Sequence, residues 1–139
     1  MKRILVMVLI VGVLVLAIMA QHRDDVHPRV SVDVSEIRVV DGDTIRWRGE
    51  RVRLTGFDAP EIFSPQCPSE LTQGRTAAAA LLRDLQGATV IELATFPRKD
   101  RYGRIVATLW LDGQDVAERM VAAGFARFYD GGQRHGWCP

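Results

Sequence analysis

Two short segments of this sequence carry acidic side chains whose types and spacing suit a reaction at phosphorus. The first holds Asp41 and Asp43 on either side of a glycine, and the second holds Asp58 and Glu61 on either side of an Ala-Pro pair. Neighbouring carboxylates repel each other, and a bound cation relieves that repulsion. Because the candidate ligands are all oxygens, the pattern favours a hard ion such as Ca²⁺ or Mg²⁺.

Two arginines lie near these acids in the sequence. Arg53 ends an apolar stretch shortly before Asp58, and Arg104 follows the Tyr102-Gly103 pair. Guanidinium groups grip phosphate oxygens and stabilise the charge that develops on them during a displacement. With the acids, they could hydrolyse a phosphodiester around one metal ion. Each feature also has an ordinary explanation, since Asp-Gly pairs are common in solvated turns and a lone arginine on a strand usually faces solvent.

The elements that would position these residues follow from the hydrophobic pattern. Alternating and β-branched residues predict five strands, at 35–40, 44–47, 51–54, 89–93 and 105–111. One helix is predicted from Ser69 or Thr72 to about Leu85, and a second from Asp115 to just before Gly124. Short strands with an interposed helix indicate a β-rich α+β domain built as a small, partly open barrel.

The N-terminal part has a different character. Lys2 and Arg3 precede an uncharged apolar run at 4–20, which as a helix would measure about 26 Å. This suits an N-terminal apolar helix that is either a signal anchor or a cleaved signal peptide. The folded domain would then lie outside the cytoplasm, anchored to the membrane or, after cleavage, periplasmic or secreted. The predicted leader, tether and folded domain occupy 1–21, 22–31 and 32–139.

The charge balance excludes a generally basic nucleic-acid-binding surface. The 139 residues include 18 Lys and Arg against 17 Asp and Glu, and removing Lys2 and Arg3 with the leader leaves 16 against 17. Domains that bind nucleic acid through their whole surface usually show a strong basic excess. Any contact with a polyanion must therefore come from a local site.

Three segments, taken in order, resemble a known family. They are Asp41-Gly42-Asp43-Thr44, Arg53 with Asp58-Ala59-Pro60-Glu61, and Asp100-Arg101-Tyr102-Gly103-Arg104. The ordered set is similar to the staphylococcal nuclease (thermonuclease) family and extends over about 35–129. The resemblance implies the fold of that family, a five-stranded OB-like barrel with helices.

The resemblance also implies a Ca²⁺ site. Asp43 and Asp58 correspond to the metal-binding carboxylates of the family, and the backbone carbonyl of Ala59 corresponds to a third protein ligand. Asp41 would support these ligands from behind without touching the ion. A carbonyl ligand does not depend on its side chain, so an alanine is acceptable at position 59.

The remaining matched positions imply catalytic and substrate-binding roles. Arg53 and Arg104 correspond to two phosphate-binding arginines, and Glu61 corresponds to the proposed general base. Tyr102, with Arg101 beside it, would border the nucleotide. The implied activity is Ca²⁺-dependent hydrolysis of DNA or RNA to products with 3′-phosphate ends, carried out by a monomer. The alternative is a non-catalytic OB-like module that binds nucleic acid or another partner, although such domains typically lack several of these acids and arginines.

The two cysteines lie outside the matched segments. Cys67 and Cys138 could form a zinc site only with further ligands, of which His135 is the one nearby candidate, or they could be free thiols. A location outside the cytoplasm favours a disulfide. Such a bond would hold down the glycine-rich C-terminal segment, where Phe128 and Trp137 are available to cover the barrel, and would brace the loop after Glu61.

Overall fold

The computed structural model describes residues 28–139. The predicted leader and most of the predicted tether lie outside the described residues, but the last two tether residues form strand β1 (Val30–Ser31), which pairs with β6. Among the helices of the described part, none is both long and apolar enough to span a bilayer.

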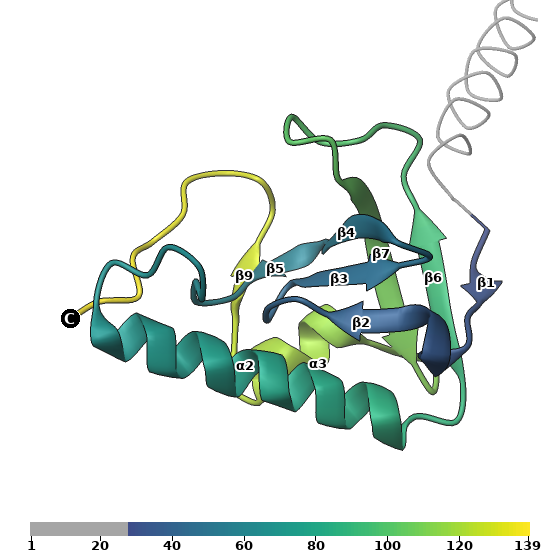
Figure 1. Ribbon diagram of the computed structural model, residues 1–139, viewed down its shortest axis with the longest axis horizontal. Coiled ribbons are helices and arrows are strands. Elements are labelled where there is room, and N and C mark those ends of the chain that lie inside the picture. The colour runs from purple at the N-terminus through teal and green to yellow at the C-terminus, as the bar shows by residue number, and fades with distance from the viewer. Residues whose placement is uncertain (1–27) are drawn as a thin grey trace, which may run out of the picture.

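A curled mixed sheet forms most of the domain (Figure 1). Its strands run in the order β1-β6-β7-β4-β3-β2, and β8 pairs with β7. Strands β2 to β4 are an antiparallel meander, β6 and β7 are antiparallel, and β4 joins β7 in parallel. The bounds are β2 (Ile37–Val39), β3 (Thr44–Trp47), β4 (Glu50–Leu54), β6 (Ile91–Thr95), β7 (Ile105–Leu111) and β8 (Gln114–Asp115).

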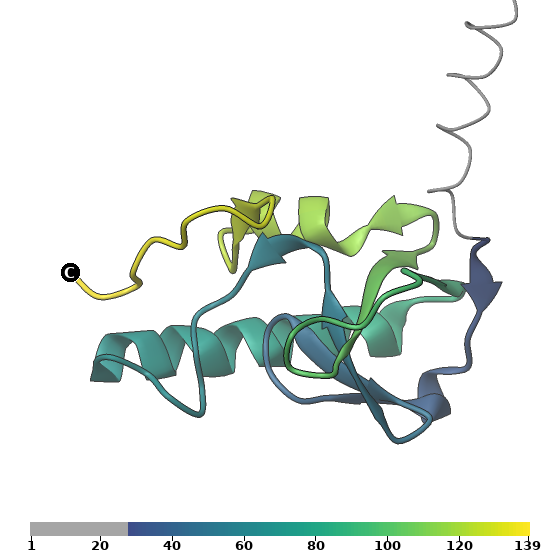
Figure 2. The same cartoon turned by 90° about the horizontal axis from the view of Figure 1, so that it is seen from above.

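Two further strands form a small separate sheet. β5 (Gly56–Asp58) follows β4 almost directly and pairs antiparallel with β9 (Arg127–Tyr129). This pairing brings the C-terminal segment back to the segment that carries the second acidic pair. In Figures 1 and 2 the chain continues from β9 towards the start of α2.

In residues 28–139, two α-helices and one short 3₁₀ turn complete the fold. α2 (Pro68–Gly87) begins with a proline, a residue suited to the first turn because it has no N–H to leave unpaired. α3 (Val116–Ala122) begins after Asp115, whose side chain accepts the backbone N–H of Ala117. The 3₁₀ turn η1 (Val34–Glu36) is capped by Asp33 in the same way.

The core lies between the concave face of the sheet and the two helices. Large apolar side chains fill it and are almost completely buried, and hydrophobic burial of this kind is the main force that closes such a barrel. The main contributors are Ile45, Val52, Leu54, Phe57, Leu81, Leu85, Leu93, Leu109, Leu111, Val116 and Met120. The predicted β-rich α+β fold, an OB-like barrel with two helices, is confirmed.

Some predicted element boundaries differ from the observed ones. The sequence places residues 35 and 36 in the first strand, but they belong to η1 because the Asp33 side chain caps that turn. The strand predicted at 89–93 lies at 91–95 instead. Asp112 Oδ1 accepts the backbone N–H groups of Thr89 and Val90, which removes them from the ladder.

Two glycines allow close contacts beneath the acidic segments. A Cβ atom on Gly42 would lie 2.6 Å from the Cβ of Ala59, and a Cβ atom on Gly74 would lie 2.7 Å from the carbonyl oxygen of Pro60 and 2.9 Å from that of Glu61. The Asp41–Asp43 turn can therefore rest on the loop after β5, and that loop can rest on α2.

Candidate active site

Arg53 joins the two acidic segments in one buried cluster. In the β3–β4 pairing Thr44 lies opposite Arg53, so Asp43 stands beside the arginine at the end of the hairpin. Arg53 Nη2 lies 3.2 Å from Asp43 Oδ2 and 3.5 Å from Asp58 Oδ1. The structure thus brings together three of the residues predicted for the site, and Asp43 and Asp58 share one guanidinium.

Arg53 is also bound to the backbone around it. Its Nη1 donates to the carbonyl oxygens of Leu54 and Asp43, and its Nη2 donates to that of Phe57 at 2.9 Å. The residue is only 7 % exposed. Arg53 therefore does not face solvent as a lone arginine on a strand usually does. Its hydrogen bonds to Leu54 and Phe57 instead fix the turn that leads into β5.

The first acidic pair is held by hydrogen bonds. Asp43 Oδ2 accepts the backbone N–H of Ala59 at 3.0 Å, and Asp43 Oδ1 accepts the hydroxyl of Thr44 at 3.1 Å. Asp41 Oδ1 in turn accepts the backbone N–H of Asp43 at 3.1 Å. Burial, followed by the nearby charge of Asp43, raises the pKa of Asp41 to about 6. Asp41 thus holds the backbone of Asp43 in place.

Asp58 holds the least satisfied polar atom of this cluster. Its Oδ1 is buried and accepts no hydrogen bond within the described part of the chain. Arg134 Nε lies 3.2 Å away and Arg53 Nη2 lies 3.5 Å away, but neither nitrogen is oriented to donate a hydrogen bond. Trp137 Nε1 donates to Asp58 Oδ2 at 3.5 Å. Burial raises the pKa of Asp58 despite the charge of Arg134.

Glu61 lies in the loop between β5 and α2, which a second glutamate organises. Glu70, on the first turn of α2, is 4 % exposed. Its carboxylate accepts the backbone N–H of Glu61 at 3.3 Å and that of Gln66 at 2.6 Å. The Glu61 side chain itself remains half-exposed. Partial burial, together with the charge of Asp43, raises its pKa.

Arg104 is fixed by the turn that precedes β7. Its Nε lies 2.7 Å from Asp100 Oδ2, and its backbone N–H donates to Asp100 Oδ1. Although burial opposes it, the hydrogen bonds from Arg104 lower the pKa of Asp100. Tyr102, at the tip of the turn, is 66 % exposed. Arg101 Nη2 donates to the Tyr102 hydroxyl at 2.7 Å, so the pair predicted to border a nucleotide lies together.

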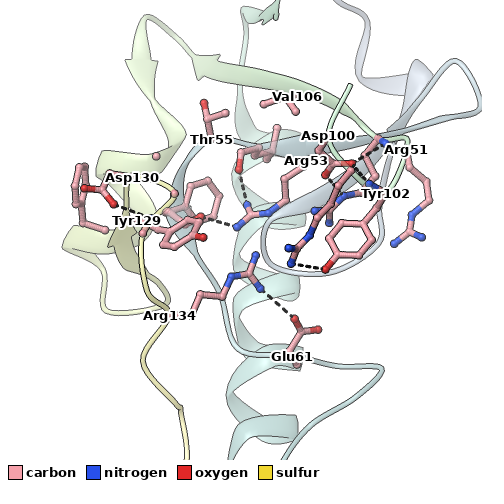
Figure 3. Close-up of a pocket in the computed structure, with 18 residues that line it drawn as sticks. Arg51, Arg53, Thr55, Glu61, Asp100, Tyr102, Val106, Tyr129, Asp130 and Arg134 are labelled. Atoms are coloured by element: carbon pink, nitrogen blue, oxygen red, sulfur yellow. Dashed lines mark hydrogen bonds and ion pairs between the residues drawn. The ribbon is translucent and has the colours of Figure 1, made fainter. Parts of the chain in front are cut away.

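An open cavity of about 1030 Å³ connects these groups (Figure 3). Arg53, Glu61, Arg101, Tyr102 and Arg104 all line it, which places the predicted catalytic and substrate-binding side chains around one space. The buried acids, in contrast, lie behind Arg53. Further lining residues come from the C-terminal segment and include Phe128, Tyr129, Asp130 and Arg134.

The structure contains the predicted disulfide between Cys67 and Cys138. It ties the C-terminal segment to the residue just before α2, and Arg127 stabilises that segment further by donating to the Gly136 carbonyl oxygen and stacking on the Trp137 ring. The expectation that Phe128 covers the barrel is wrong, because this side chain is 75 % exposed at the cavity.

Sequence reasoning missed two charged side chains at the site, Arg134 and Glu70. Arg134 reaches Asp58 and Glu61 from the glycine-rich segment, and Glu70 supports the loop of Glu61. A signal for Arg134 was present: a disulfide at Cys138 brings the preceding residues to the loop after Glu61. Glu70 resembled an ordinary acid in the first turn of a helix.

Asp43 and Asp58 could bind a cation, although in the described part of the chain the metal-ligating side chains do not form a complete site. Within residues 28–139 no group of three or more His, Cys, Asp or Glu side chains could by itself hold a metal ion. The carboxylates of Asp43 and Asp58 nevertheless both pair with the Arg53 guanidinium, and Asp58 Oδ1 accepts no hydrogen bond. A buried carboxylate oxygen without a donor is what a hard cation would satisfy.

Comparison with known proteins identifies the family. The family model described as "Staphylococcal nuclease homologue" matches residues 51–135. Thermonuclease of Staphylococcus hyicus is 30 % identical and that of Staphylococcus intermedius is 33 % identical; each alignment covers 91 % of this chain and 82 % of the relative. The SPbeta prophage-derived endonuclease YokF of Bacillus subtilis is 34 % identical over 69 % of this chain and 34 % of its own length. This chain is therefore a hydrolase of the staphylococcal nuclease family.

Proposed function

We propose that this protein is a Ca²⁺-dependent phosphodiesterase that hydrolyses DNA or RNA and leaves 3′-phosphate ends. One observation carries the proposal: Arg53 contacts both Asp43 and Asp58 and also lines the cavity that holds Glu61 and Arg104. A cation-binding acid pair, a base and phosphate-binding guanidiniums are the groups that this reaction requires.

Asp43 and Asp58 would hold the cation, with the backbone carbonyl of Ala59 as a third protein ligand. Asp41 keeps Asp43 oriented through its hydrogen bond to the Asp43 backbone. When bound, Ca²⁺ neutralises the negative charge that develops on the phosphoryl oxygens.

Glu61 is the proton acceptor in this scheme. Its carboxylate faces the cavity and its loop is anchored by Glu70, so it can orient a water molecule and take a proton from it. The raised pKa strengthens it as a base relative to an ordinary glutamate. The attacking water passes one proton to a Glu61 oxygen as its oxygen bonds to phosphorus. The bond from phosphorus to the 5′-oxygen breaks, and that oxygen takes up a proton from solvent water.

Arg104 and Tyr102 would meet the substrate at the other wall of the cavity. Asp100 holds Arg104 through Nε, which leaves its terminal nitrogens able to bind phosphate oxygens. The exposed ring of Tyr102, with Arg101 on its hydroxyl, can stack on a base of single-stranded nucleic acid.

The proposed site of action is outside the cytoplasm. The disulfide between Cys67 and Cys138 suits an oxidising compartment. The apolar run at 4–20 would act as a membrane anchor or as a cleaved signal, and the domain would act as a monomer.

A digest tests the proposed function directly. The purified full chain is incubated with single-stranded and plasmid DNA and with RNA, in Ca²⁺, in Mg²⁺ and with a chelator, and the product ends are analysed. Cleavage that needs Ca²⁺ and yields 3′-phosphates is expected. Cleavage that persists in chelator would contradict the proposed cation, 5′-phosphate products would contradict the proposed bond, and binding without cleavage would indicate the non-catalytic module.

A further inference from the structure

Arg134 adds a guanidinium to the cavity, which Arg51 and Arg101 also line, beside the two arginines that family resemblance assigns to phosphate. It comes from the C-terminal segment after β9, and Figure 3 shows it pointing towards Glu61. Its Nε lies 3.2 Å from Asp58 Oδ1 and its Nη1 lies 3.7 Å from Glu61 Oε1. Its side chain is 45 % exposed, so it reaches both the buried acids and the open cavity.

Arg53 has little donor capacity left for a substrate. A guanidinium carries five N–H donors. Both terminal nitrogens of Arg53 are already bound to backbone carbonyls, and Nη2 also faces Asp43 and Asp58. Its buried contacts hold the acidic cluster together and leave mainly Nε as a donor for a phosphate in the cavity. Such a phosphate therefore needs further donors from more exposed guanidiniums.

Arg134 is held in place by the structure of its segment. Its guanidinium lies 5.2 Å from the centre of the Tyr129 ring. On the other side of it, the Cys67–Cys138 disulfide and the Arg127 bond to Gly136 fix the backbone. The positions before and after Arg134 are therefore both restrained, which limits the entropy lost when the guanidinium binds a ligand.

We propose that Arg134 is a substrate-contacting residue that binds a phosphate of the nucleic acid, and that it occupies the Asp58 and Glu61 carboxylates only in the free protein. The proposal rests on the proposed function, because it needs a polyanion in this cavity. A cation on Asp58 removes the attraction that holds Arg134 there. The guanidinium, already in the cavity, then pairs with a phosphate oxygen instead.

Two variants and one control test this role. Arg134→Ala removes the charge, Arg134→Lys keeps it without the planar fork, and His135→Ala alters an exposed neighbour on the same segment. For Arg134→Ala we expect KM on single-stranded DNA to rise about tenfold, the lower end for a hydrogen bond to a charged group, with kcat nearly unchanged. Arg134→Lys should restore part of the loss, and His135→Ala should behave as the wild type.

Salt dependence separates a phosphate contact from a merely structural role. Binding of a labelled single-stranded oligonucleotide is followed by fluorescence anisotropy in Ca²⁺ at several salt concentrations. Loss of one phosphate contact should reduce the slope of log K against log salt by about 0.7. Arg134→Lys keeps the charge and should keep the wild-type slope. If Arg134→Ala only loosened the fold, its affinity would fall but its slope would also stay at the wild-type value.

Calorimetry gives a readout that does not involve nucleic acid. Because Arg134 competes with the cation for Asp58, Arg134→Ala should bind Ca²⁺ more tightly than the wild type, whereas a damaged site would bind it more weakly. Unchanged KM with an unchanged salt slope would overturn the proposal, as would a higher kcat/KM in Arg134→Ala. If the wild type binds the oligonucleotide without cleaving it, the proposed function fails, and the slope still decides the role of Arg134.

Discussion

Arg53 and Glu70 are buried charged side chains that organise the loops of the site. Arg53 binds carbonyl oxygens along the turn from β4 into β5, and Glu70 accepts the N–H groups of Glu61 and Gln66. Buried charges persist only where partners satisfy them, so each fixes the backbone around it. The side chains proposed to react are therefore carried by loops whose conformation is fixed by the buried charges of Arg53 and Glu70.

Replacement of Glu61 by glutamine tests its role as a base. The amide keeps the size of the side chain but cannot take a proton, so turnover should fall by about 10²–10⁴-fold. Ca²⁺ binding by calorimetry and thermal melting should stay close to wild type. Glu118→Gln, an exposed acid on α3, is the matched control. Turnover near that of the control would remove Glu61 from the mechanism.

Replacement of Asp43 should lower stability as well as abolish Ca²⁺ binding. If the repulsion between the carboxylates of Asp43 and Asp58 were the only effect, a neutral residue at position 43 would stabilise the metal-free fold. The structure reverses this expectation, because Asp43 pairs with buried Arg53 and accepts the Ala59 N–H. Asp43→Ala should cost about 3 kcal/mol, and Asp43→Asn should cost less. Urea unfolding in chelator measures both, and a more stable alanine variant would contradict the prediction.

Asp41 makes the stability of the metal-free protein depend on pH. Burial raises its pKa to about 6 in the fold, well above the ordinary value of an aspartate, so the native state binds a proton that the unfolded chain has already released. The stability gained from this bound proton is fully present below the pKa of Asp41 in the unfolded chain. It is lost as the pH rises through the folded-state pKa of about 6. Between pH 7.5 and 5.5 the free energy of unfolding in chelator should rise by about 1 kcal/mol. Asp41→Asn should flatten the profile, and a flat wild-type profile would refute the prediction.

The acids and the two matched arginines could be predicted from the sequence because short, ordered motifs carry them. Their chemistry was visible in residue types, and one hairpin brings Asp43 next to Arg53. The burial of Arg53 could not be predicted, since an alternating strand assigns it to the solvent face. Arg134 was missed although the predicted disulfide pointed to its segment, because its exact position also depends on the β5–β9 pairing, which no local pattern predicts.

At the scale of elements, the packing of α2 decides where the loop of Glu61 lies. Gly74 is the contact point, because the carbonyl oxygens of Pro60 and Glu61 occupy the space of a Cβ atom. The strands that form the barrel were predictable from periodicity, but β5 and β9 are three residues each and too short to show a period. Their pairing is a tertiary feature.

Gly74→Ala should displace the loop without disrupting the barrel. The added methyl meets backbone atoms, which cannot rotate away, so the Pro60–Glu61 segment must shift. In enzymes a misplacement of about 1 Å can cost 10²-fold in rate, and we expect a loss of kcat of that order. Gly87→Ala, at the end of the same helix with no atom within 4 Å of the added Cβ, is the control. Equal kcat in the two variants would show that the contact has no influence.

At the scale of the molecule, the disulfide joins the last segment to the site. It closes a sequence separation of 71 residues, and loss of a native disulfide in a small domain costs about 2–5 kcal/mol. Cys138→Ser should therefore lower the Tm. It should also raise KM, because Arg134 loses its restraint, and Cys67→Ser should reproduce both changes. Unchanged melting and kinetics in either variant would show that the disulfide is incidental.

The parallel pairing of β4 with β7 has a consequence for when activity arises. Val52 lies opposite Ile105, and Phe57 lies opposite Phe128, so the walls of the cavity are distant in sequence. Such long-range pairings form late and slowly during folding. A chain emerging from the ribosome carries its acids early but can enclose a substrate only after Arg134 and Cys138 have been added. Synthesis of the whole chain therefore precedes the closure of the cavity.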